Sequence, residues 1–353
     1  MQILNQTLEE IAPVDAAWRQ RARARLEQLT MPHWALGRIM DLAEDLAGMT
    51  RSMTPPVSPR TVVTMAADHG VVAEGVSAYP QEVTLQMVHN FVNGGAGINA
   101  LASQSHTDVK VVDMGVAADL SELADAGKII SRRIGPGTAN MAVGPAMSRE
   151  DAVRSIEAGI GIANELCAEY SAFGTGDMGI GNTTPSTAVV AVVTGASIAE
   201  LTGRGTGIND KQLVHKAQVI EKAIEVNRPD PDDPIDILSK VGGFEIGGIA
   251  GLILGAAANR KPVVVDGFIS TAGALLAQAL NPAATDYMIM AHRSVEQGHA
   301  AMHRVLGKEP LLDLNLRLGE GTGGALAMNL LDAAVAVLTK VATFEEAAVS
   351  EAE

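Results

Sequence analysis

The sequence has one cysteine and few aromatic side chains. Cys167 is the only cysteine among 353 residues, and there are five Phe, three Tyr and two Trp. A single cysteine excludes an intramolecular disulfide and any metal site built from several cysteine ligands. This usage is typical of a cytoplasmic protein, and we expect that location. With so few aromatic rings, the core is predicted to consist of Ala, Val, Leu, Ile and Met.

Basic residues and long apolar runs are also scarce. Lys and Arg number 26 against 41 Asp and Glu, a formal net charge of −15, so no nucleic-acid partner is expected. The longest apolar run, 246–258, is shorter than the roughly 18 residues that span a bilayer, so no membrane partner is expected either. Glu9, Glu10 and Asp15 precede the first arginines, which predicts neither a signal peptide nor a transit peptide.

The two ends of the chain have the apolar spacing of helices. Helices are predicted at 16–29, 36–46 and 323–341, and a proline-rich linker at 53–59. We therefore expect two domains: a small helical domain of residues 1–55, completed by about 325–353, and a large α/β domain of residues 56–324.

Beyond the linker, short apolar runs alternate with longer helical stretches, as in repeated βα units. Strands are expected at 61–66, 109–112, 263–265, 287–290 and 312–318. The predicted fold class is α/β, a parallel sheet with helices on both faces. Ligands bind at the carboxyl ends of such strands, and two of these ends are the polar or glycine-rich segments 68–70 and 319–321.

The densest glycine cluster, 174–185, is a candidate anion site. Pro185 is predicted to begin a helix capped by Thr184, so that glycine N–H groups and a helix N-terminus face one point, which favours phosphate. A purely structural turn is one alternative. Dinucleotide binding is another, because Gly174, Gly176 and Gly179 match G-x-G-x-x-G, although 165–173 predicts only a poor strand.

A second glycine run, 203–207, precedes Lys216 along the chain. It is either a flexible loop near a solvated lysine or part of the same site. The sequence contains neither a Walker A motif nor G-x-S-x-G, which argues against P-loop ATP hydrolysis and α/β-hydrolase chemistry. The Pro- and Asp-rich stretch 227–234 is predicted to be a solvated loop between helices.

Two sets of histidines invite a metal or acid–base interpretation. One set, spaced three or four residues apart, would share a helix face if 292–303 is helical: His292, Glu296, His299 and His303. H-E-x-x-H is absent and a solvated polar face is the simpler interpretation, so no metal is expected. Asp68-His69 is either a metal or acid–base pair, or a strand-end Asp that caps the next turn.

The stretch 312–324 ends in a carboxylate between glycines. Strict alternation predicts a strand with one polar face, and Glu320 then stands where the next helix begins. Glu320 is either an electrostatic partner of that helix N-terminus or a base that projects into the crevice.

Five separated segments carry a resemblance to a known family. They cover nearly the whole chain in order: 67–71 (ADHGV), 174–185 (GTGDMGIGNTTP), 238–244 (LSKVGGF), 265–268 (VDGF) and 317–321 (RLGEG). On these segments the sequence resembles the nicotinate-nucleotide:dimethylbenzimidazole phosphoribosyltransferases.

The resemblance implies a homodimer with a Rossmann-like parallel-sheet domain and a small helical domain drawn from both termini. It implies transfer of 5-phosphoribose from nicotinate mononucleotide to a benzimidazole-type base, with inversion of the anomeric carbon and no cofactor. The product would be the α-ribazole 5′-phosphate used as the lower ligand of cobalamin. Glu320 matches the family's catalytic base.

The resemblance also suggests the remaining site residues. Asp177 and Lys216 match further catalytic positions. The predicted substrate-binding residues are Gly176, Gly179, Gly181, Asn182, Thr183, Gly205, Ser294, Arg317, Gly319, Tyr79 and Gln86. The sequence departs from the family pattern at 31–38 and at Tyr79. These departures leave open which acceptor base is used, but not the phosphoribosyl donor. Two other functions stay open: an NAD-dependent oxidoreductase, and a non-catalytic nucleotide or base sensor on the same fold.

Overall fold

A computed structural model describes residues 1–350 and is built around a parallel sheet of six strands. The strand order is β3-β2-β1-β4-β5-β6. The strands are β1 (Arg60–Ala67), β2 (Asp108–Gly115), β3 (Ile130–Ser131), β4 (Ala172–Met178), β5 (Val263–Val265) and β6 (Met288–Met290). The predicted α/β class is confirmed. Because the winding reverses between β1 and β4, a crevice is expected at their carboxyl ends.

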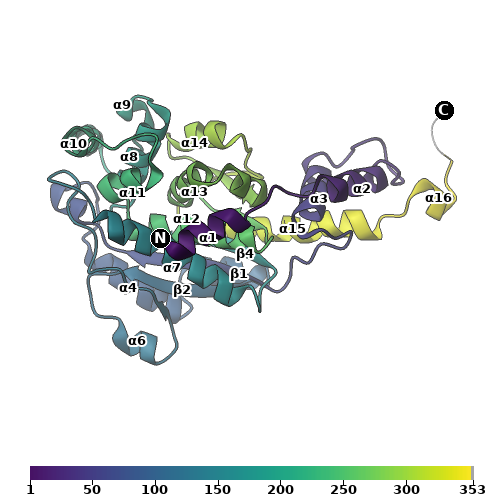
Figure 1. The fold of residues 1–353 in the computed structure, drawn as a ribbon, viewed down its shortest axis with the longest axis horizontal. Coiled ribbons are helices and arrows are strands. Elements are labelled where there is room, and N and C mark those ends of the chain that lie inside the picture. The colour runs from purple at the N-terminus through teal and green to yellow at the C-terminus, as the bar shows by residue number, and fades with distance from the viewer. Residues whose placement is uncertain (351–353) are drawn as a thin grey trace.

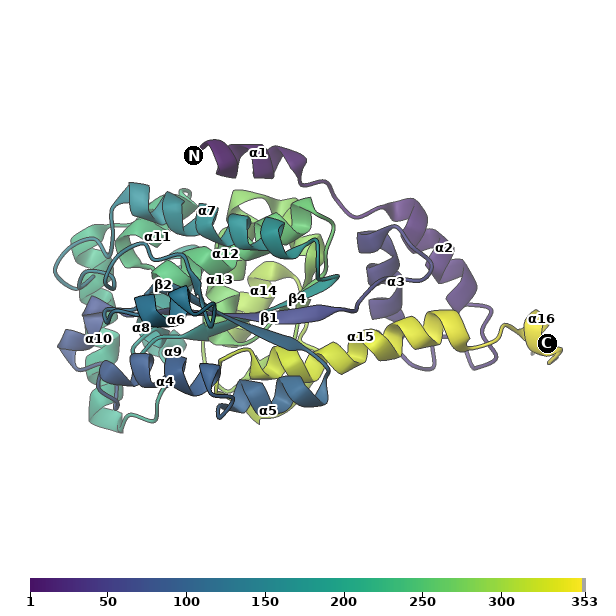
Figure 2. The same cartoon turned by 90° about the horizontal axis from the view of Figure 1, so that it is seen from below.

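Helices cover both faces of the sheet (Figure 2). On one face lie α7 (Arg149–Leu166), α12 (Phe244–Ala258) and α13 (Phe268–Leu280), and on the other α4 (Glu82–Val92) and α5 (Gly97–Gln104). The remaining helices of the large α/β part are η1 (Gly70–Glu74), α6 (Ser121–Asp125), α8 (Thr183–Thr194), α9 (Ile198–Leu201), α10 (Asp210–Asn227), α11 (Pro234–Val241), η2 (Pro282–Tyr287) and α14 (His299–Leu306). The apolar run 246–258 lies in α12, which is buried along nearly its whole length.

A helical lobe projects from the sheet (Figures 1 and 2). In it α2 (Ala16–Leu26) and α3 (Arg38–Thr50) pack against each other and against α15 (Thr322–Lys340), which leads to α16 (Phe344–Ala347). The C-terminal helix thus folds back on the N-terminal helices, as expected. By contrast, α1 (Gln2–Glu10) packs on α7 and α12. The domain boundaries near residues 55 and 325 stay a prediction.

Helix α15 is long and apolar enough, by length and composition, to cross a membrane. Half of it is buried inside the protein, where it contacts α3, α5 and β4. Burial of that extent is typical of a core helix, and a single such helix is weak evidence for a membrane span.

The central strand β4 differs from the prediction. Residues 172–178 form a strand, whereas the sequence predicted a turn there after a poor strand, because Gly and Ala have low strand propensity. Both glycines are needed for packing: a Cβ at Gly174 would lie 2.8 Å from Val62 Cγ2, and one at Gly176 would overlap the carbonyl oxygen of Glu320. Since both lie inside a strand, they do not form a dinucleotide-binding turn.

The condition for a shared helix face, one helix over 292–303, is not met. Residues 292–294 form strand β7 (His292–Ser294), and only His299 and His303 lie on α14. Strand β7 pairs with β8 (Leu312–Leu316) in a separate two-stranded sheet. The strand expected at 312–318 is therefore present but ends two residues earlier, outside the main sheet. Helix α8 begins at Thr183 with Asn182 as N-cap, slightly before the predicted Thr184 cap.

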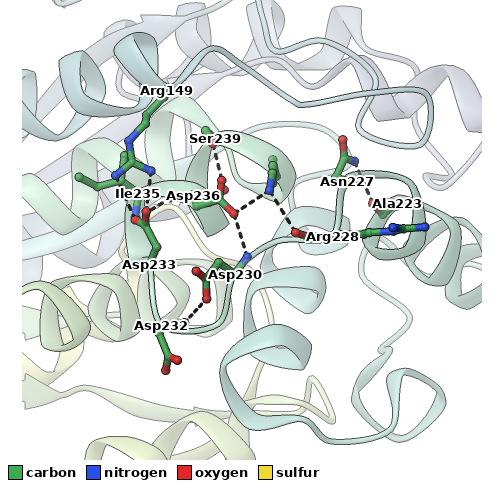
Figure 3. Close-up of polar contacts among 11 residues, drawn as sticks. Arg149, Ala223, Asn227, Arg228, Asp230, Asp232, Asp233, Ile235, Asp236 and Ser239 are labelled. Atoms are coloured by element: carbon green, nitrogen blue, oxygen red, sulfur yellow. Dashed lines mark hydrogen bonds and ion pairs between the residues drawn. The ribbon is translucent and has the colours of Figure 1, made fainter.

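The acidic loop between α10 and α11 is present as expected (Figure 3). Asp233 caps α11, because its Oδ1 accepts the N–H groups of Ile235 and Asp236 at 3.0 and 3.1 Å. Arg149 Nη1 donates to Asp233 Oδ2 at 2.7 Å. Asp236 accepts a hydrogen bond from Lys240. Helix capping and ion pairing thus account for these carboxylates.

Glycines let α7 and α12 cross closely. A Cβ at Gly251 of α12 would overlap the carbonyl oxygen of Ile156 on α7. We expect Gly251→Ala to lower the free energy of unfolding by roughly 3 kcal/mol, measured by urea denaturation, because the helices must move apart. Gly161→Ala on α7 is the matched control, since no atom lies within 4 Å of its Cβ position. Equal stability of the Gly251→Ala variant and the native protein would contradict this packing.

Candidate active site

A cavity of about 550 Å³ opens at the carboxyl end of β4. Its walls come from the β4–α8 turn, the 205–206 loop, the start of α13, strand β7 and segment 317–320. Among the apolar side chains that line it are Val83, Met87, Met178, Phe268 and Leu318. The cavity thus combines an apolar wall with polar groups from strand ends, as small-molecule sites do.

Three consecutive residues with positive φ place Glu320 in the cavity wall. The φ angles of Gly319, Glu320 and Gly321 are 84°, 62° and 95°. A non-glycine residue in this region costs roughly 1 kcal/mol, and such strain is found at functional sites. Buried Asp266 holds the turn, because its two oxygens accept the N–H groups of Gly321 and Gly324 at 3.1 and 2.9 Å.

The Glu320 carboxylate is fixed by backbone hydrogen bonding and forms no ion pair within residues 1–350. Only 5% of the residue is exposed, and Oε2 accepts the N–H of Ile98 at 3.0 Å, at the start of α5. Burial raises the pKa of Glu320, and hydrogen bonds from the backbone of Ile98 and Gly97 oppose this only in part. A carboxylate whose pKa is raised is a stronger base than a solvated one.

Asp177 lies beside Glu320 at the end of β4. Its Oδ2 accepts a hydrogen bond from Asn182 Nδ2 at 3.0 Å, and its buried Oδ1 has no partner among residues 1–350. Burial and the nearby Asp266 carboxylate raise the pKa of Asp177 well above its usual value. The protonated form, which can donate a hydrogen bond to a ligand, is favoured.

A buried lysine lies behind another part of the same cavity. Lys216 is 1% exposed, and its Nζ donates to Thr183 Oγ1 at 2.6 Å. A Cβ at Gly205 would lie 3.3 Å from this Nζ, so glycine gives the ammonium access to the cavity edge. Burial lowers the pKa of Lys216 to about 8, although Glu296 opposes the effect.

This pKa predicts a pH dependence. Lys216 is cationic below about pH 8 and becomes neutral above it, so kcat/KM for an anionic substrate should fall as pH rises through about 8. A pH–rate profile from 7 to 10 measures this. Lys216→Arg, which stays charged, should abolish the fall. A flat profile for the native protein would contradict the assignment.

Glu296 also lines the cavity, although its spacing in the sequence grouped it with the histidines and not with the substrate-binding residues. It is 8% exposed, its Oε1 accepts the N–H of Gly205 at 3.0 Å, and its buried Oε2 has no partner within residues 1–350. Its place two residues after the end of β7 was the available signal, but helical spacing to the histidines suggested another role. Arg317 Nη1 donates to the Gly205 carbonyl at 3.4 Å and so reaches the same loop.

The structure brings most of the predicted residues together. Those that line the cavity are Tyr79, Asp177, Gly179, Gly181, Asn182, Thr183, Gly205, Ser294, Arg317, Gly319 and Glu320. Gly176 lies in β4 against the Glu320 backbone, and Lys216 lies behind Thr183. Tyr79 is 54% exposed. Gln86 is exposed on α4 and is not part of the cavity wall.

Asp68 and His69 do not face each other as a pair. Asp68 Oδ2 accepts the N–H of Ala117 at 2.8 Å, whereas His69 Nε2 lies 2.8 Å from Glu245 Oε1. Burial lowers the pKa of His69, but the charge and hydrogen bond of Glu245 outweigh it and leave the pKa raised. In the described residues no group of three or more His, Cys, Asp and Glu side chains could hold a metal ion.

The other histidines form a buried column instead of a helix face. The ring centroids of His292 and His299 are 6.2 Å apart, and those of His299 and His303 are 4.2 Å apart. Burial lowers the pKa of His292 and of His303 to about 4. The imidazoles are therefore neutral and pack together, and His292 Nδ1 lies 3.7 Å from the buried Asp266 carboxylate.

Comparison with known proteins shows the family of this chain. A family model described as a phosphoribosyltransferase matches residues 11–349. The nicotinate-nucleotide–dimethylbenzimidazole phosphoribosyltransferase of Syntrophotalea carbinolica is 63% identical over 351 residues, covering 99% of each chain. That of Desulfotalea psychrophila is 59% identical over 354 residues, covering 100% of each. The chain belongs to this family.

A crystal structure of a nicotinate-nucleotide–dimethylbenzimidazole phosphoribosyltransferase from Thermus thermophilus has the same fold. It is 43% identical, with a TM-score of 0.90 over 96% of this chain and 100% of that one. The protein is thus an enzyme of the phosphoribosyltransferase type, and the resemblance found in the sequence is confirmed.

Proposed function

We propose that this enzyme transfers the 5-phosphoribosyl group of nicotinate mononucleotide to a benzimidazole-type base. The observation that carries the proposal is the arrangement of one cavity, with the fixed Glu320 carboxylate in its wall and the Lys216 ammonium behind Thr183 and Gly205. The family relatives are named for this reaction. An anion held near Lys216 and a heterocycle held at Glu320 would share the cavity, as a donor and an acceptor must.

The reaction is a single displacement in this account. One ring nitrogen of the base attacks the anomeric carbon of the donor ribose from the face opposite nicotinate, and the bond from that carbon to the pyridinium nitrogen breaks. The bonding electrons return to the pyridine ring, which leaves neutral with respect to that nitrogen, so no general acid is required. The anomeric carbon is inverted.

Glu320 acts on the acceptor. Attack makes the benzimidazole ring cationic, and a carboxylate at the N–H of its second nitrogen stabilises this charge and accepts the proton. The raised pKa of Glu320 and its fixed position at the Ile98 N–H support this role. The product is then the α-ribazole 5′-phosphate.

Asp177, Lys216 and Arg317 act on the donor. Lys216 and the cavity-lining Arg317 supply positive charge for the phosphate. Protonated Asp177 donates a hydrogen bond to a donor oxygen, and the unpartnered Glu296 Oε2 accepts one from a ribose hydroxyl. We further propose that the enzyme is a cytoplasmic homodimer. The single free cysteine, Cys167, supports the cytoplasmic location. Exposed apolar side chains such as Leu318, which is 60% exposed at the cavity rim, support an interface between two copies.

Product analysis tests the proposal. The enzyme is incubated with nicotinate mononucleotide and a panel of bases (5,6-dimethylbenzimidazole, benzimidazole, adenine and a phenol), and products are identified by mass spectrometry. We expect nicotinate release that depends on a benzimidazole and a product containing that base with phosphoribose. We expect NADH to leave nicotinate release unchanged. Absence of nicotinate release with every base would refute the transferase reaction and favour a sensor.

A further inference from the structure

A second cavity, of about 630 Å³, lies between the helical lobe and the large part of the molecule. It is separate from the active-site cavity: the β7 side chains of His292 and Ser294 line the active site, whereas Arg293, between them, lines the second cavity. Alternation along a strand thus directs neighbouring side chains into two different cavities.

The second cavity is basic in a protein whose net charge is −15. Arg38, Arg293, Arg304 and Lys308 line it, together with two acidic residues, Glu309 and Asp313. Four cationic side chains and two carboxylates give the cavity a net positive charge, which is opposite in sign to the net charge of the whole chain. Such local concentration of positive charge is the pattern expected of a site for a small anion.

Among the described residues, Arg38 and Arg304 have no acidic partner, and those of the other two cations are weak or more distant. Arg38 Nη1 and Nη2 donate to the carbonyl oxygens of Pro310 and Glu309 at 2.5 and 2.8 Å, which position the guanidinium without cancelling its charge. Arg293 lies 3.6 Å from Asp313, and both side chains are 62% exposed, a geometry that contributes little. Within residues 1–350, Arg304 and Lys308 form no ion pair closer than 4 Å, but Lys308 lies near enough to the Asp45 carboxylate to oppose the rise in the pKa of Asp45.

A buried imidazole completes the wall. His303 is 8% exposed and lines the cavity, yet neither of its ring nitrogens has a hydrogen-bond partner among residues 1–350. Its neighbour His299 cannot supply one, because His299 Nδ1 accepts the Ser294 N–H and its Nε2 is bonded to Thr271 Oγ1. A buried polar group without a partner is costly, so a ligand in the cavity would satisfy it.

We propose that this second cavity binds a phosphate group, either as inorganic phosphate or as a small phosphate monoester. Arg304, Lys308 and Arg38 pair with its negative oxygens. The neutral His303 ring donates its one N–H to a phosphate oxygen. Three cations and one neutral donor can all reach oxygens of a phosphate, which carries more acceptor oxygens and more negative charge than a carboxylate.

Histidine NMR on the full-length protein tests this site. The active-site cavity also binds phosphate in our account, so every protein carries Lys216→Gln to weaken that site. Inorganic phosphate and ribose 5-phosphate are titrated separately into ¹⁵N-histidine-labelled protein, and Lys216→Gln/His303→Gln assigns the His303 signal. We expect a saturable shift of the His303 ring resonance, and which titrant acts at lower concentration identifies free phosphate or a monoester as the ligand.

Charge-matched variants separate the site from general charge effects. Adding Arg304→Gln and Lys308→Gln should weaken the His303 response at least about tenfold, since two charge-assisted contacts are removed. Adding Lys128→Gln and Lys222→Gln, at two exposed lysines elsewhere, removes the same charge and should leave the response unchanged. The proposal is overturned if neither titrant shifts His303, or if both pairs of substitutions weaken the response equally.

Discussion

Glu320→Gln is expected to lower kcat by about 10²–10⁴ while the dissociation constant of nicotinate mononucleotide stays nearly unchanged. Glutamine keeps the size of the side chain but cannot accept the ring proton or stabilise the cationic heterocycle. In our proposal the donor phosphate is held elsewhere in the cavity, near Lys216, so its binding should not depend on this carboxylate. Steady-state kinetics combined with calorimetric titration of the donor separates the two effects.

Two controls sharpen this prediction. Glu221→Gln removes a carboxylate at an exposed position on α10 and should leave kcat unchanged. In the native enzyme kcat/KM should rise with pH as Glu320 ionises, over a range above the usual glutamate pKa, since burial raises the pKa of this side chain. The Glu320→Gln enzyme should lack that rise. A Glu320→Gln enzyme that keeps native turnover would remove Glu320 from the mechanism.

Lys216→Met is expected to lower kcat/KM for the donor by about 10²–10³, chiefly through KM, because a charge-assisted contact with the phosphate is lost in a desolvated place. The variant should not be less stable than the native protein, because an ammonium that is 1% exposed is replaced by an apolar side chain of similar length. Donor kinetics and thermal denaturation measure the two quantities.

Lys222→Met is the matched control for Lys216→Met. Lys222 is an exposed lysine on the same helix, α10, and its substitution should change neither KM nor stability. If Lys216→Met lowered kcat alone and left KM intact, Lys216 would act on the reacting atoms and not on the donor phosphate.

Sequence patterns predicted the sheet where its strands are apolar. Val263–Val265 and the core of β1 contain β-branched residues on a buried strand, and both were located correctly. The strand that shapes the site, β4, was missed for a physical reason. Gly174 and Gly176 are needed so that Met328 and the Glu320 turn can pack against it, and these contacts come from residues distant in the sequence.

The site itself was predictable in part. Glu320 stands out in the sequence because a carboxylate between two glycines at a strand end is unusual, and the structure shows why: three successive positive φ angles hold it in the cavity wall. Lys216 gave a weaker signal, since its spacing from 203–207 alone does not show burial. Glu296 and the histidine column were misplaced because helical spacing does not reveal that a strand and a turn occupy 292–298.

A crystal structure of the Glu320→Gln enzyme with nicotinate mononucleotide and 5,6-dimethylbenzimidazole tests the central claim most directly, because slow turnover preserves both substrates. We predict the donor phosphate against Lys216 and Gly205, and a ring nitrogen of the base at about 2.6–3.2 Å from the side-chain oxygen or nitrogen of residue 320. The other ring nitrogen should face the anomeric carbon. A base bound away from residue 320, or a phosphate bound away from Lys216, would contradict the account.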